Sequence, residues 1–424
     1  MDPIQVLVIG DGVREYEMAW MIAKSPIVCT IFCAPGNAGM RLIPGAECID
    51  IKANDIPALL KFAKEQEIEV TIVGSEEPQF NGIVDAFENA KLPIFGSREK
   101  AAKLAGGSKT LAKHFMGRHD IPTAPFNVFA NADEAIELLK KTAEKKSTKF
   151  PLVLKMDGLA VGKGVRVCND LQSALEFLEE IRSGKFGNAN DSLLLEDYLL
   201  GEKASYSVLV DKKGNFIPLA SSQNNKRIGN GDVGFNTGGM GAYSPAPVVT
   251  AVAEEEIHDI VRKVIKGMRE EENPFFGFLN LGLMIKDEEL NVLELNVCLG
   301  DLDTPPIMAR MKTSFLTLIS AAIEGKLDTC TIRWDDVPAV CFVAAAEGYP
   351  GTLIKGDEIL GIKDAEKTGA IVSFAGVALN ESGNLITAGE KVLSVTHKGN
   401  FPGDYLGARK KACEALEKIL FCGQ

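Results

Sequence analysis

The sequence predicts an α/β protein that opens with a doubly wound parallel sheet and closes with a β-rich α+β domain. Three observations lead to this prediction. Over the first 96 residues, short apolar runs alternate with segments of helical periodicity, the pattern of strands joined by helices in a parallel sheet. Around residues 193–211, two apolar segments follow each other closely and indicate an antiparallel part. After Asp328, short strands alternate with turns until a final helix.

The elements of the N-terminal sheet can be placed in order along the chain. Strands are expected at 4–9, 28–34, 69–74 and 94–96, and helices at 15–24, 56–66 and 81–89. Ligands of such sheets bind on the loops that follow the carboxyl ends of the strands. The loops in which a ligand site is expected are therefore 10–14, 35–39 and 74–80.

The remainder of the chain contains longer helices and one region without a clear pattern. Helices are expected at 97–118 with an interruption at Gly106 and Gly107, at 132–149 with a lysine-rich solvated end, at 253–269 and at 402–420. Strands are expected at 150–155, 193–198, 205–211, 279–286 and 291–295. Residues 223–241 are polar and glycine-rich without periodicity, and they predict a long loop, which in a compact domain is usually functional or mobile.

The composition excludes several classes of protein. The 424 residues are 46% hydrophobic and 25% charged, which is typical of globular domains and not of collagen, coiled coils or disordered chains. A formal net charge of −12 gives no overall positive field for nucleic acid, so an anionic ligand has to be held by local cationic groups. The sequence contains neither a run of 18 apolar residues nor a basic and then apolar signal segment at its start.

The histidines and cysteines argue against two common kinds of site. The 4 His form no cluster, which disfavours a zinc hydrolase or a His-based triad. The 9 Cys are scattered and include no C-x-x-C pair, as expected of a reduced protein without a disulfide framework. Together with the absence of a targeting segment, these observations predict a cytoplasmic protein.

Two glycine-rich turns follow the first two predicted strands. Gly10-Asp11-Gly12 matches the start of a dinucleotide fingerprint, but Glu15 stands where that pattern needs its third glycine. A plain structural turn explains the segment as well as a phosphate site made of backbone N–H groups and Arg14. The second turn, residues 35–39, favours a ligand, because the two loops would then lie at the ends of adjacent parallel strands.

Two lysines bracket a glycine-rich loop at residues 155–164, which read K-M-D-G-L-A-V-G-K-G. The loop is not a Walker A motif, since glycine is missing at 157 and Gly164 stands where Ser or Thr is needed. Lys155 ends a strand and Lys163 lies among glycines, so both ammonium groups can converge on a polyphosphate. A glycine-rich hairpin that only turns the chain is the alternative.

A second glycine-rich segment follows Lys226 and Arg227. Within it, the backbone N–H groups of Gly238 and Gly239 suit an anion that develops during a reaction. A surface loop this rich in hydrogen-bond donors would ordinarily be disordered, but Met240 and Tyr243 give this one apolar anchors.

The pair Glu294 and Asn296 is a candidate metal site. The two residues are two apart on a predicted strand, so both side chains face the same side. Two oxygen ligands on one face suit Mg²⁺, which takes its other ligands from water and phosphates. The outward face of an ordinary strand explains the pair equally well, but Gly300-Asp301 follows closely and favours a functional site.

Several long and unusual strings lie in order along the chain: A-P-G-N-A-G (34–39), G-S-K-T-L-A-K-H-F-M (107–116), I-P-T-A (121–124), K-M-D-G-L-A-V-G-K-G (155–164), N-T-G-G-M-G-A-Y-S-P-A-P (236–247), E-L-N (294–296) and E-G-Y-P-G (347–351). In this order they resemble the phosphoribosylamine–glycine ligase (glycinamide ribonucleotide synthetase) family of the ATP-grasp superfamily. The resemblance implies an N-terminal α/β domain at 1–102, an ATP-grasp domain at 103–330 with a small subdomain at about 123–200, and a C-terminal domain at 331–424.

The resemblance also implies a reaction of de novo purine biosynthesis. ATP would phosphorylate the carboxylate of glycine, and the amine of 5-phosphoribosylamine would attack the acyl phosphate to give an amide, ADP and phosphate. Phosphoryl transfer needs mainly cations, a metal ion and positioning from the protein, so the scarcity of His is no obstacle. The implied partners are small molecules, without nucleic acid or membrane, and the implied state is a monomer or weak dimer.

Position by position, the resemblance implies roles for the candidate residues. ATP is expected at Lys109, Lys155, Gly162, Lys163, Gly164, Glu196, Asp197, Tyr198, Leu199, Glu202 and Lys203. The other substrates are expected at Gly12, Arg14, Glu15, Gly36, Asn37, Ala38, Glu76, Asn224 and Cys298. Mg²⁺ or Mn²⁺ is expected on Glu294 and Asn296, and acyl transfer beside Lys226, Arg227, Gly238, Gly239 and Asp301.

The chain departs from the family pattern at polar positions of the implied site. Asn224 stands where Asp is usual, Cys298 where Arg is usual, and Lys203 where a Glu usually contacts the ribose. Loss of an Arg removes up to five donors and a charge, and truncation of a hydrogen-bonded charge pair commonly costs about 2–5 kcal/mol. The changes at 224 and 298 point to the amino-acid pocket more than to the ATP phosphates.

Three functions therefore stay open on the sequence. The first is the standard ligase with glycine. The second is a paralogue that activates a different acid or uses a different amine, which Asn224 and Cys298 suggest. The third is a weakly active nucleotide-binding relative, which Lys203 suggests.

Overall fold

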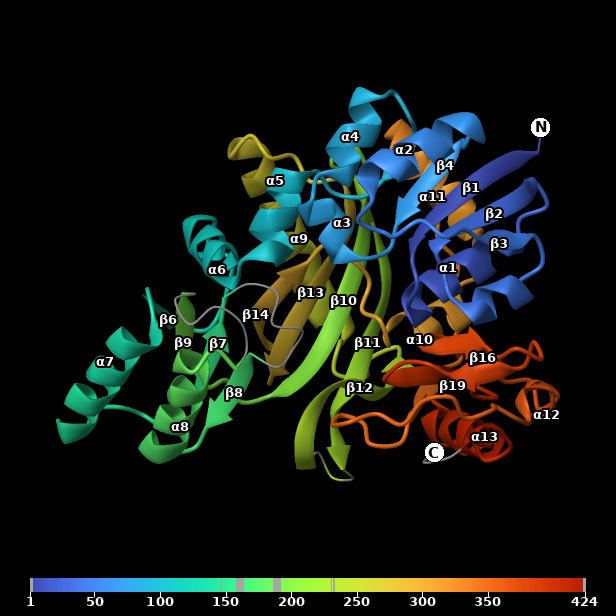
Figure 1. The fold of residues 1–424 in the computed structure, drawn as a ribbon. Coiled ribbons are helices and arrows are strands. Elements are labelled where there is room, and N and C mark those ends of the chain that lie inside the picture. Colours follow the sequence, from blue (N-terminus) through green and yellow to red (C-terminus); the bar gives the residue numbers. More distant parts are fainter. Residues whose placement is uncertain are drawn as a thin grey trace.

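The computed structural model describes residues 3–421 except 146, 158–163, 186–191, 230 and 232. It confirms the predicted mixed α/β class (Figure 1). The N-terminal sheet is parallel and has the order β3-β2-β1-β4-β5, formed by β1 (Ile4–Gly10), β2 (Val28–Pro35), β3 (Ala46–Cys48), β4 (Val70–Val73) and β5 (Ile94–Phe95).

Helices cover both faces of this sheet because successive strand side chains point to opposite sides. On β1, Leu7 and Ile9 belong to the core under α2 (Ile56–Glu65) and α4 (Ile83–Asn89). Val6 and Val8 belong to the core under α1 (Val13–Ala23) on the other side. The predicted helix at 81–89 is preceded by a separate short helix, α3 (Glu76–Phe80), and a short 3₁₀ turn, η1 (Ala38–Leu42), follows β2.

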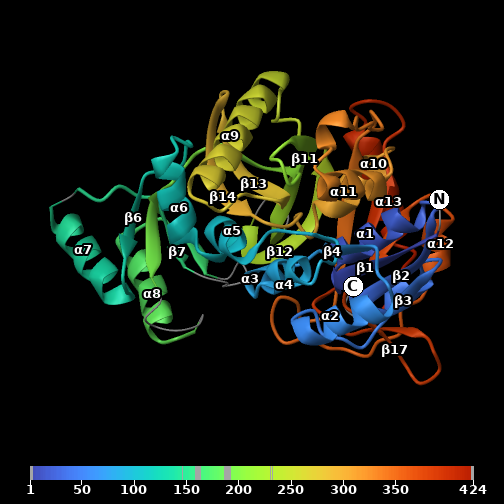
Figure 2. The same ribbon diagram turned by 90° about the horizontal axis from the view of Figure 1, so that it is seen from above.

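A small lobe with its own core lies at one end of the molecule (Figure 2). Its antiparallel sheet has the order β6-β9-β7-β8, formed by β6 (Phe126–Phe129), β7 (Leu152–Met156), β8 (Val165–Cys168) and β9 (Leu193–Asp197). The helices α7 (Ala132–Glu144) and α8 (Leu171–Arg182) pack on it, and Phe177 and Leu178 are buried beneath α8. The sequence analysis did not predict α8.

The largest sheet has eight antiparallel strands in the order β14-β13-β10-β11-β12-β15-β19-β16. They are β10 (Glu202–Val210), β11 (Phe216–Gly229), β12 (Val233–Ser244), β13 (Gly277–Lys286), β14 (Glu289–Asn296), β15 (Ala339–Ala345), β16 (Ile371–Phe374) and β19 (Lys391–Lys398). The pairing of β12 with β15, for example Ala242 with Cys341, joins the central and C-terminal parts. The sheet therefore continues across residue 330, and a separate hairpin of β17 (Val377–Leu379) and β18 (Leu385–Thr387) lies outside it.

The predicted long loop at 223–241 is wrong, because these residues form most of the hairpin of β11 and β12. The strands pair in antiparallel register, with Gln223 opposite Tyr243 and Gly229 opposite Val233. Ser221, Ser222 and Gln223 are consecutive and all buried, so polar residues occupy both faces of β11. A strand with two polar faces shows no period of two in its hydrophobicity, and the sequence pattern therefore hides it.

The remaining helices support the large sheet and the N-terminal domain. They are α5 (Glu99–Ala102), α6 (Lys109–Arg118), α9 (Ala251–Glu270), α10 (Thr304–Arg310), α11 (Phe315–Glu324), α12 (Ile362–Glu366) and α13 (Tyr405–Leu416), with short turns at η2 (Lys103–Gly107) and η3 (Leu327–Thr329). The predicted helix at 97–118 is broken where its glycines lie: η2 ends at Gly107, and Ser108 caps α6 by accepting from Leu111 N. Every helix among the described residues is too short or too polar to cross a lipid bilayer.

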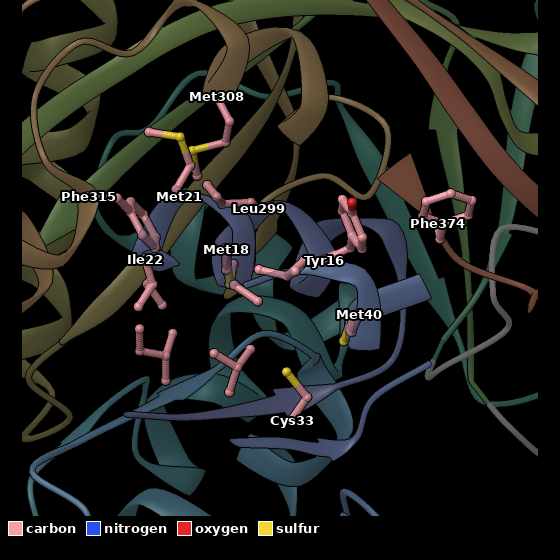
Figure 3. Close-up of a cluster of buried hydrophobic side chains, with 14 of the residues drawn as sticks. Tyr16, Met18, Met21, Ile22, Cys33, Met40, Leu299, Met308, Phe315 and Phe374 are labelled. Atoms are coloured by element: carbon pink, nitrogen blue, oxygen red, sulfur yellow. The ribbon is translucent and has the colours of Figure 1, made fainter. Parts of the chain in front are cut away.

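Helix α1 is the most enclosed helix near the proposed ligand loops. Figure 3 shows its side chains Met18, Met21 and Ile22 among Met308, Phe315 and other apolar side chains. The helix also contacts β16, and Tyr16 packs edge-on against Phe374 with 5.6 Å between ring centroids. Because α1 begins at Val13, within the predicted loop 10–14, this packing fixes the position of that loop.

Candidate active site

The three predicted ligand loops meet at the carboxyl edge of the parallel sheet. Asn37 Nδ2 donates to the carbonyl of Asp11 over 2.8 Å, which joins loop 35–39 to loop 10–14. Arg14 Nη1 lies 3.1 Å from Glu76 Oε1, which joins loop 10–14 to loop 74–80. Asn37 also caps η1 by accepting from Gly39 N and Met40 N, so the loop that holds Gly36 and Ala38 is rigidly built.

Arg14 is buried and its guanidinium is bonded to groups of the protein. Nε lies 2.8 Å from Glu15 Oε1, and Nη1 donates to the carbonyl of Leu299 over 2.8 Å in addition to contacting Glu76. Burial alone would lower the pKa of Arg14, but the carboxylates of Glu15 and Glu76 raise it well above its ordinary value. Arg14 is therefore a fixed cation that holds together the N-terminal loops and the segment after β14.

Two carboxylates occupy the amino end of α1, where the sequence predicted a phosphate. Gly12 N donates to Glu15 Oε2 over 2.8 Å, and Arg14 N donates to Asp301 Oδ1 over 3.4 Å. Burial raises the pKa of Glu15. A phosphate that bound to these N–H groups would first have to displace the carboxylate of Glu15 or Asp301. The two carboxylates at this end of α1 therefore favour an amine over a phosphate as the ligand group that lies next to them.

Two residues from the C-terminal part of the chain, which the sequence analysis did not single out, lie near the amino end of α1. Lys391, the first residue of β19, forms an ion pair with Asp301. Gly238 N donates to the hydroxyl of Tyr349 over 3.1 Å. Tyr349 lies within the E-G-Y-P-G string noted in the sequence, whereas Lys391 lies 90 residues from its partner in a strand of unremarkable pattern.

Gly238 and Gly239 lie in an irregular part of β12, where the pairing with β11 shifts register, and this segment (the glycine turn) lies against Asn224. Gly239 has φ +107°, and a Cβ there would lie 2.4 Å from Asn224 Oδ1. The N–H of Gly239 donates to Thr237 Oγ1 over 2.9 Å, and that of Gly238 donates to the hydroxyl of Tyr349. Both N–H groups that were predicted to stabilise an anion are therefore bonded to hydroxyl groups. Asn224 Oδ1 is buried and has no hydrogen-bond partner among the described residues, which leaves an acceptor for a ligand donor.

Gly239→Ala tests the tight packing of this turn. The added Cβ would lie 2.4 Å from Asn224 Oδ1 and 2.6 Å from Leu302 Cδ1, in a backbone conformation that favours glycine. We expect about 100-fold lower kcat and about 3 kcal/mol lower free energy of unfolding. Steady-state kinetics and denaturant unfolding measure both quantities.

Gly231→Ala is the matched control for this substitution. Gly231 lies in the same hairpin with φ +80°, but a Cβ there meets no atom of the described residues within 4 Å. We expect a stability loss of about 1 kcal/mol and unchanged kcat. Equal losses of kcat in the two variants would show that the packing of Gly239 against Asn224 has no part in catalysis.

A second group of charged residues lies where β7 and β9 of the small lobe approach α6. Lys155 Nζ lies 2.9 Å from Glu196 Oε2, and Lys113 Nζ lies 3.3 Å from the same oxygen. Lys113 also donates to Thr123 Oγ1, and burial lowers its pKa to about 8. Lys155 and Glu196 were predicted, whereas Lys113, one turn after Lys109 on α6, was missed.

Four lysines, one each on α6, β7, β10 and β11, act electrostatically on Glu294. The ammonium of Lys226 lowers the pKa of the Glu294 carboxyl against the opposing effect of burial. Three further lysines lower it as well: Lys155, Lys109 and Lys203. The structure therefore brings together the residues that were predicted to hold ATP phosphates and metal.

The metal prediction rests on the donor groups of β14. Glu294 pairs with Gly282 and Asn296 with Asn280 in the register with β13, so both side chains lie on one face of the sheet. The described residues contain no group of three or more His, Cys, Asp or Glu that could enclose a metal ion. One carboxylate and one amide fit Mg²⁺ or Mn²⁺ in a site that a nucleotide phosphate completes, and they do not fit a fully protein-bound metal.

The other residues that were predicted to bind ATP lie in or next to the cluster of charged residues around Glu196 and Glu294. Asp197 ends β9 and is followed by Tyr198 and Leu199, and Gln223 Nε2 contacts Glu202 Oε2 over 3.2 Å and the carbonyl of Lys203 over 3.0 Å. Gly164 accepts a backbone hydrogen bond from Met156 N over 2.8 Å. Gly162 and Lys163 lie outside the described residues.

Cys298 is packed and is not built as a nucleophile. Gln79 Nε2 lies 3.1 Å from its sulfur, and burial raises the pKa of the Cys298 thiol well above its ordinary value. The same Gln79 accepts from Ser97 N over 2.7 Å and donates to the carbonyl of Ser75. Position 298 thus connects the N-terminal loops to the segment after β14, while Asn224 lies at the glycine turn.

Comparison with known proteins places similar sequences and structures along the whole chain. The phosphoribosylglycinamide synthetase N domain matches residues 4–105, the ATP-grasp (A) domain matches 107–304, and the C domain matches 339–424. Phosphoribosylamine–glycine ligases of Salmonella typhimurium and Haemophilus influenzae are each 44% identical, over 99% of this chain and 96% of their own length. The crystal structure of phosphoribosylamine–glycine ligase from Thermotoga maritima has a TM-score of 0.83 at 29% identity, over 99% of this chain and 98% of that chain.

Proposed function

Because the chain belongs to the phosphoribosylglycinamide synthetase family, we propose that it joins glycine to 5-phosphoribosylamine at the expense of ATP. The products are glycinamide ribonucleotide, ADP and phosphate. The observation that carries this proposal is the 44% identity to phosphoribosylamine–glycine ligases along 99% of the chain. The enzyme is an ATP-dependent ligase of purine synthesis with an ATP-grasp domain.

The reaction has two steps that need different groups. In the first, a carboxylate oxygen of glycine takes the γ-phosphoryl group of ATP, and ADP leaves. In the second, the amine nitrogen attacks the carbonyl carbon, the C–O bond to phosphate breaks, phosphate leaves with the bonding electrons, and the nitrogen releases a proton. The first step needs cations around the phosphates, and the second needs an oriented amine.

We place the first step between β14 and the small lobe. Lys155 and Lys109 would neutralise ATP phosphates, and both act on Glu294 in the structure. Lys113 and Lys155 share one oxygen of Glu196, which fixes Lys155 beside the segment that would face the adenine. Glu196 Oε1 is buried and has no partner among the described residues, so it is available to a ligand donor.

A divalent metal ion, Mg²⁺ or Mn²⁺, would be held by Glu294 and Asn296 together with ATP phosphates. When bound, it would neutralise the charge that develops on the transferred phosphoryl group. The carboxylate of Glu294 is kept ionised by Lys226 and its neighbours, as a metal ligand must be.

We place the second step at the amino end of α1. Asp301 and Glu76 offer carboxylates to the amine of phosphoribosylamine, and Arg14 holds Glu76 in place. Loops 10–14 and 35–39 would receive the rest of the sugar phosphate. The turn of Gly238 and Gly239, with Lys226 and Arg227 on the partner strand, would lie between the two ends.

Lys163→Ala tests the proposed phosphate loop. Loss of this ammonium is expected to lower kcat/KM for ATP about 100-fold, because an uncompensated phosphate charge remains in the transition state. ADP release at several ATP concentrations measures the effect. Unchanged kcat and KM for ATP would contradict the assignment of residues 155–164 to ATP.

The acid substrate is tested directly with a panel of acids. Glycine is expected to support ADP release with phosphoribosylamine, and larger amino acids are not. ADP release with a different acid but not with glycine would establish the paralogue that Asn224 and Cys298 suggest. Nucleotide binding without ADP release on any acid would instead establish the nucleotide-binding relative that Lys203 suggests.

The organisation of the protein completes the proposal. We propose domains at 1–102, 103–330 and 331–424, with the small subdomain at about 123–200. The partners are small molecules, and we propose a cytoplasmic enzyme that is a monomer or weak dimer. The metal identity is tested by ADP release in Mg²⁺ against Mn²⁺ after treatment with a chelator.

A further inference from the structure

The C-terminal part of the chain supplies two side chains to the acyl-transfer end of the site. Lys391 pairs with Asp301, and Tyr349 accepts a hydrogen bond from Gly238 N over 3.1 Å. The Lys391–Asp301 pair lies next to the Tyr349–Gly238 contact, because Lys391 Nζ is 3.4 Å from the position that a Cβ on Gly238 would take. The C-terminal domain thus touches both the carboxylate and the glycine turn.

The amino end of α1 also contacts Asp301. Arg14 N donates to its Oδ1 over 3.4 Å, and a Cβ on Gly12 would lie 3.2 Å from the same oxygen. Burial alone would raise the pKa of Asp301, but Lys391 and Arg14 lower it, so the group is a carboxylate. Its side chain is 32% exposed and that of Lys391 is 19% exposed, so a small substrate can reach the pair.

Different cations act on the two carboxylates. Lys226, Lys155, Lys109 and Lys203 act on Glu294 at the ATP end. Lys391 and Arg14 act on Asp301 at the other end. A change at Lys391 should therefore affect the step that takes place beside Asp301 and spare the step that takes place beside Glu294.

We propose that Lys391 is a positioning residue for amine transfer, which holds Asp301 at the amino end of α1 where it orients the attacking amine. This inference rests on the proposed function, because it assigns Asp301 to the second step of that reaction. Tyr349 holds the Gly238 turn beside it. The C-terminal domain therefore contributes two positioning residues, Lys391 and Tyr349, to the active site.

The two steps can be measured separately in Lys391→Met. With ATP, glycine and hydroxylamine but no phosphoribosylamine, trapping of the acyl phosphate as glycyl hydroxamate reports the first step. With phosphoribosylamine in place of hydroxylamine, amide formation reports both steps. Thermal unfolding of each variant shows that it is folded.

We expect Lys391→Met to lower kcat/KM for phosphoribosylamine about 30-fold, as for loss of one partner of a charge pair. Glycyl hydroxamate formation and KM for ATP should change less than about twofold, because the groups around Glu294 are untouched. Lys391→Arg should restore most of the lost activity, since an Arg at this position can also pair with Asp301.

Lys398→Met is the matched control on the same strand. Lys398 Nζ lies 2.8 Å from Asp335 Oδ2, so this variant also loses an ion pair of β19 but at a distance from Asp301. We expect both activities of Lys398→Met to equal those of the wild type.

Three results would overturn the inference while leaving the proposed function intact. They are full ligation activity in Lys391→Met, a parallel loss of hydroxamate formation and ligation, and a Lys391→Arg variant no better than Lys391→Met. If the wild type itself forms neither glycyl hydroxamate nor amide, the proposed function fails and the inference fails with it.

Discussion

Replacement of Glu294 by Gln is expected to lower kcat about 1000-fold with KM for glycine little changed. The carboxylate lies among Lys226, Lys155 and two further lysines, and its charge would hold the metal ion at the phosphates. The amide keeps the shape of the side chain and removes the charge. ADP release at increasing Mg²⁺ concentration measures the effect, and the concentration needed for half-maximal rate should rise.

Glu289→Gln is the control on the same strand. Glu289 begins β14 and is exposed, and it pairs with Lys286 at the far end of the hairpin with β13. Its substitution should leave kcat and the Mg²⁺ dependence unchanged. A Glu294→Gln variant with wild-type kcat at every Mg²⁺ concentration would remove Glu294 from the proposed metal site.

The second large effect concerns stability and comes from Glu17 on α1. Glu17 is fully buried; Ser373 donates to its Oε1, and its Oε2 has no partner among the described residues. Burial raises the pKa of Glu17 to about 7, from an ordinary value of 4.5. The folded state therefore binds this proton more tightly than the unfolded state does.

The sign of the pH dependence follows from that difference. The contribution of Glu17 to stability is fully present below about pH 4.5 and is lost as the pH rises through about 7. The difference between the two pKa values corresponds to about 3 kcal/mol in the free energy of unfolding. We expect Glu17→Gln, which stays neutral, to exceed the wild type in stability by about that amount at pH 8 and to match it near pH 4.5.

Denaturant unfolding of the wild type and the variant from pH 4.5 to 8 measures this difference. Subtraction of the two curves removes the contributions of other buried acids such as Glu15 and Asp303, whose pKa values burial also raises. Glu137→Gln, at an exposed position of α7, should show no difference from the wild type at any pH. Parallel curves for Glu17→Gln and the wild type would show that Glu17 ionises alike in both states.

Local patterns were enough to predict the framework of the site. Strands in the parallel sheet end at one edge, so loops 10–14, 35–39 and 74–80 had to meet, and the contacts of Arg14 and Asn37 confirm this. A spacing of two on a strand was enough to place Glu294 and Asn296 on one face.

Contacts between distant segments could not be predicted from such patterns. Lys391 and Asp301 are 90 residues apart, and Lys113 reaches Glu196 from another element, so no local period marks either lysine. Glu17 lies in a predicted helix, and its burial depends on the packing of α1 against β16, more than 350 residues along the chain, which no local pattern marks.

The join between β12 and β15 has a consequence for synthesis of the chain on the ribosome. Ser244 ends β12 and Ala339 begins β15, so 95 residues separate the two partners. At usual translation rates, β12 waits about 5–20 s for the strand that pairs with its free edge. An apolar strand edge that stays unpaired for that time could pair with the strands of other nascent chains. The residues of β12 that pair with β15 are Gly241 to Ser244, and Tyr243 is the one bulky side chain among them, so this edge is a poor template for aggregation.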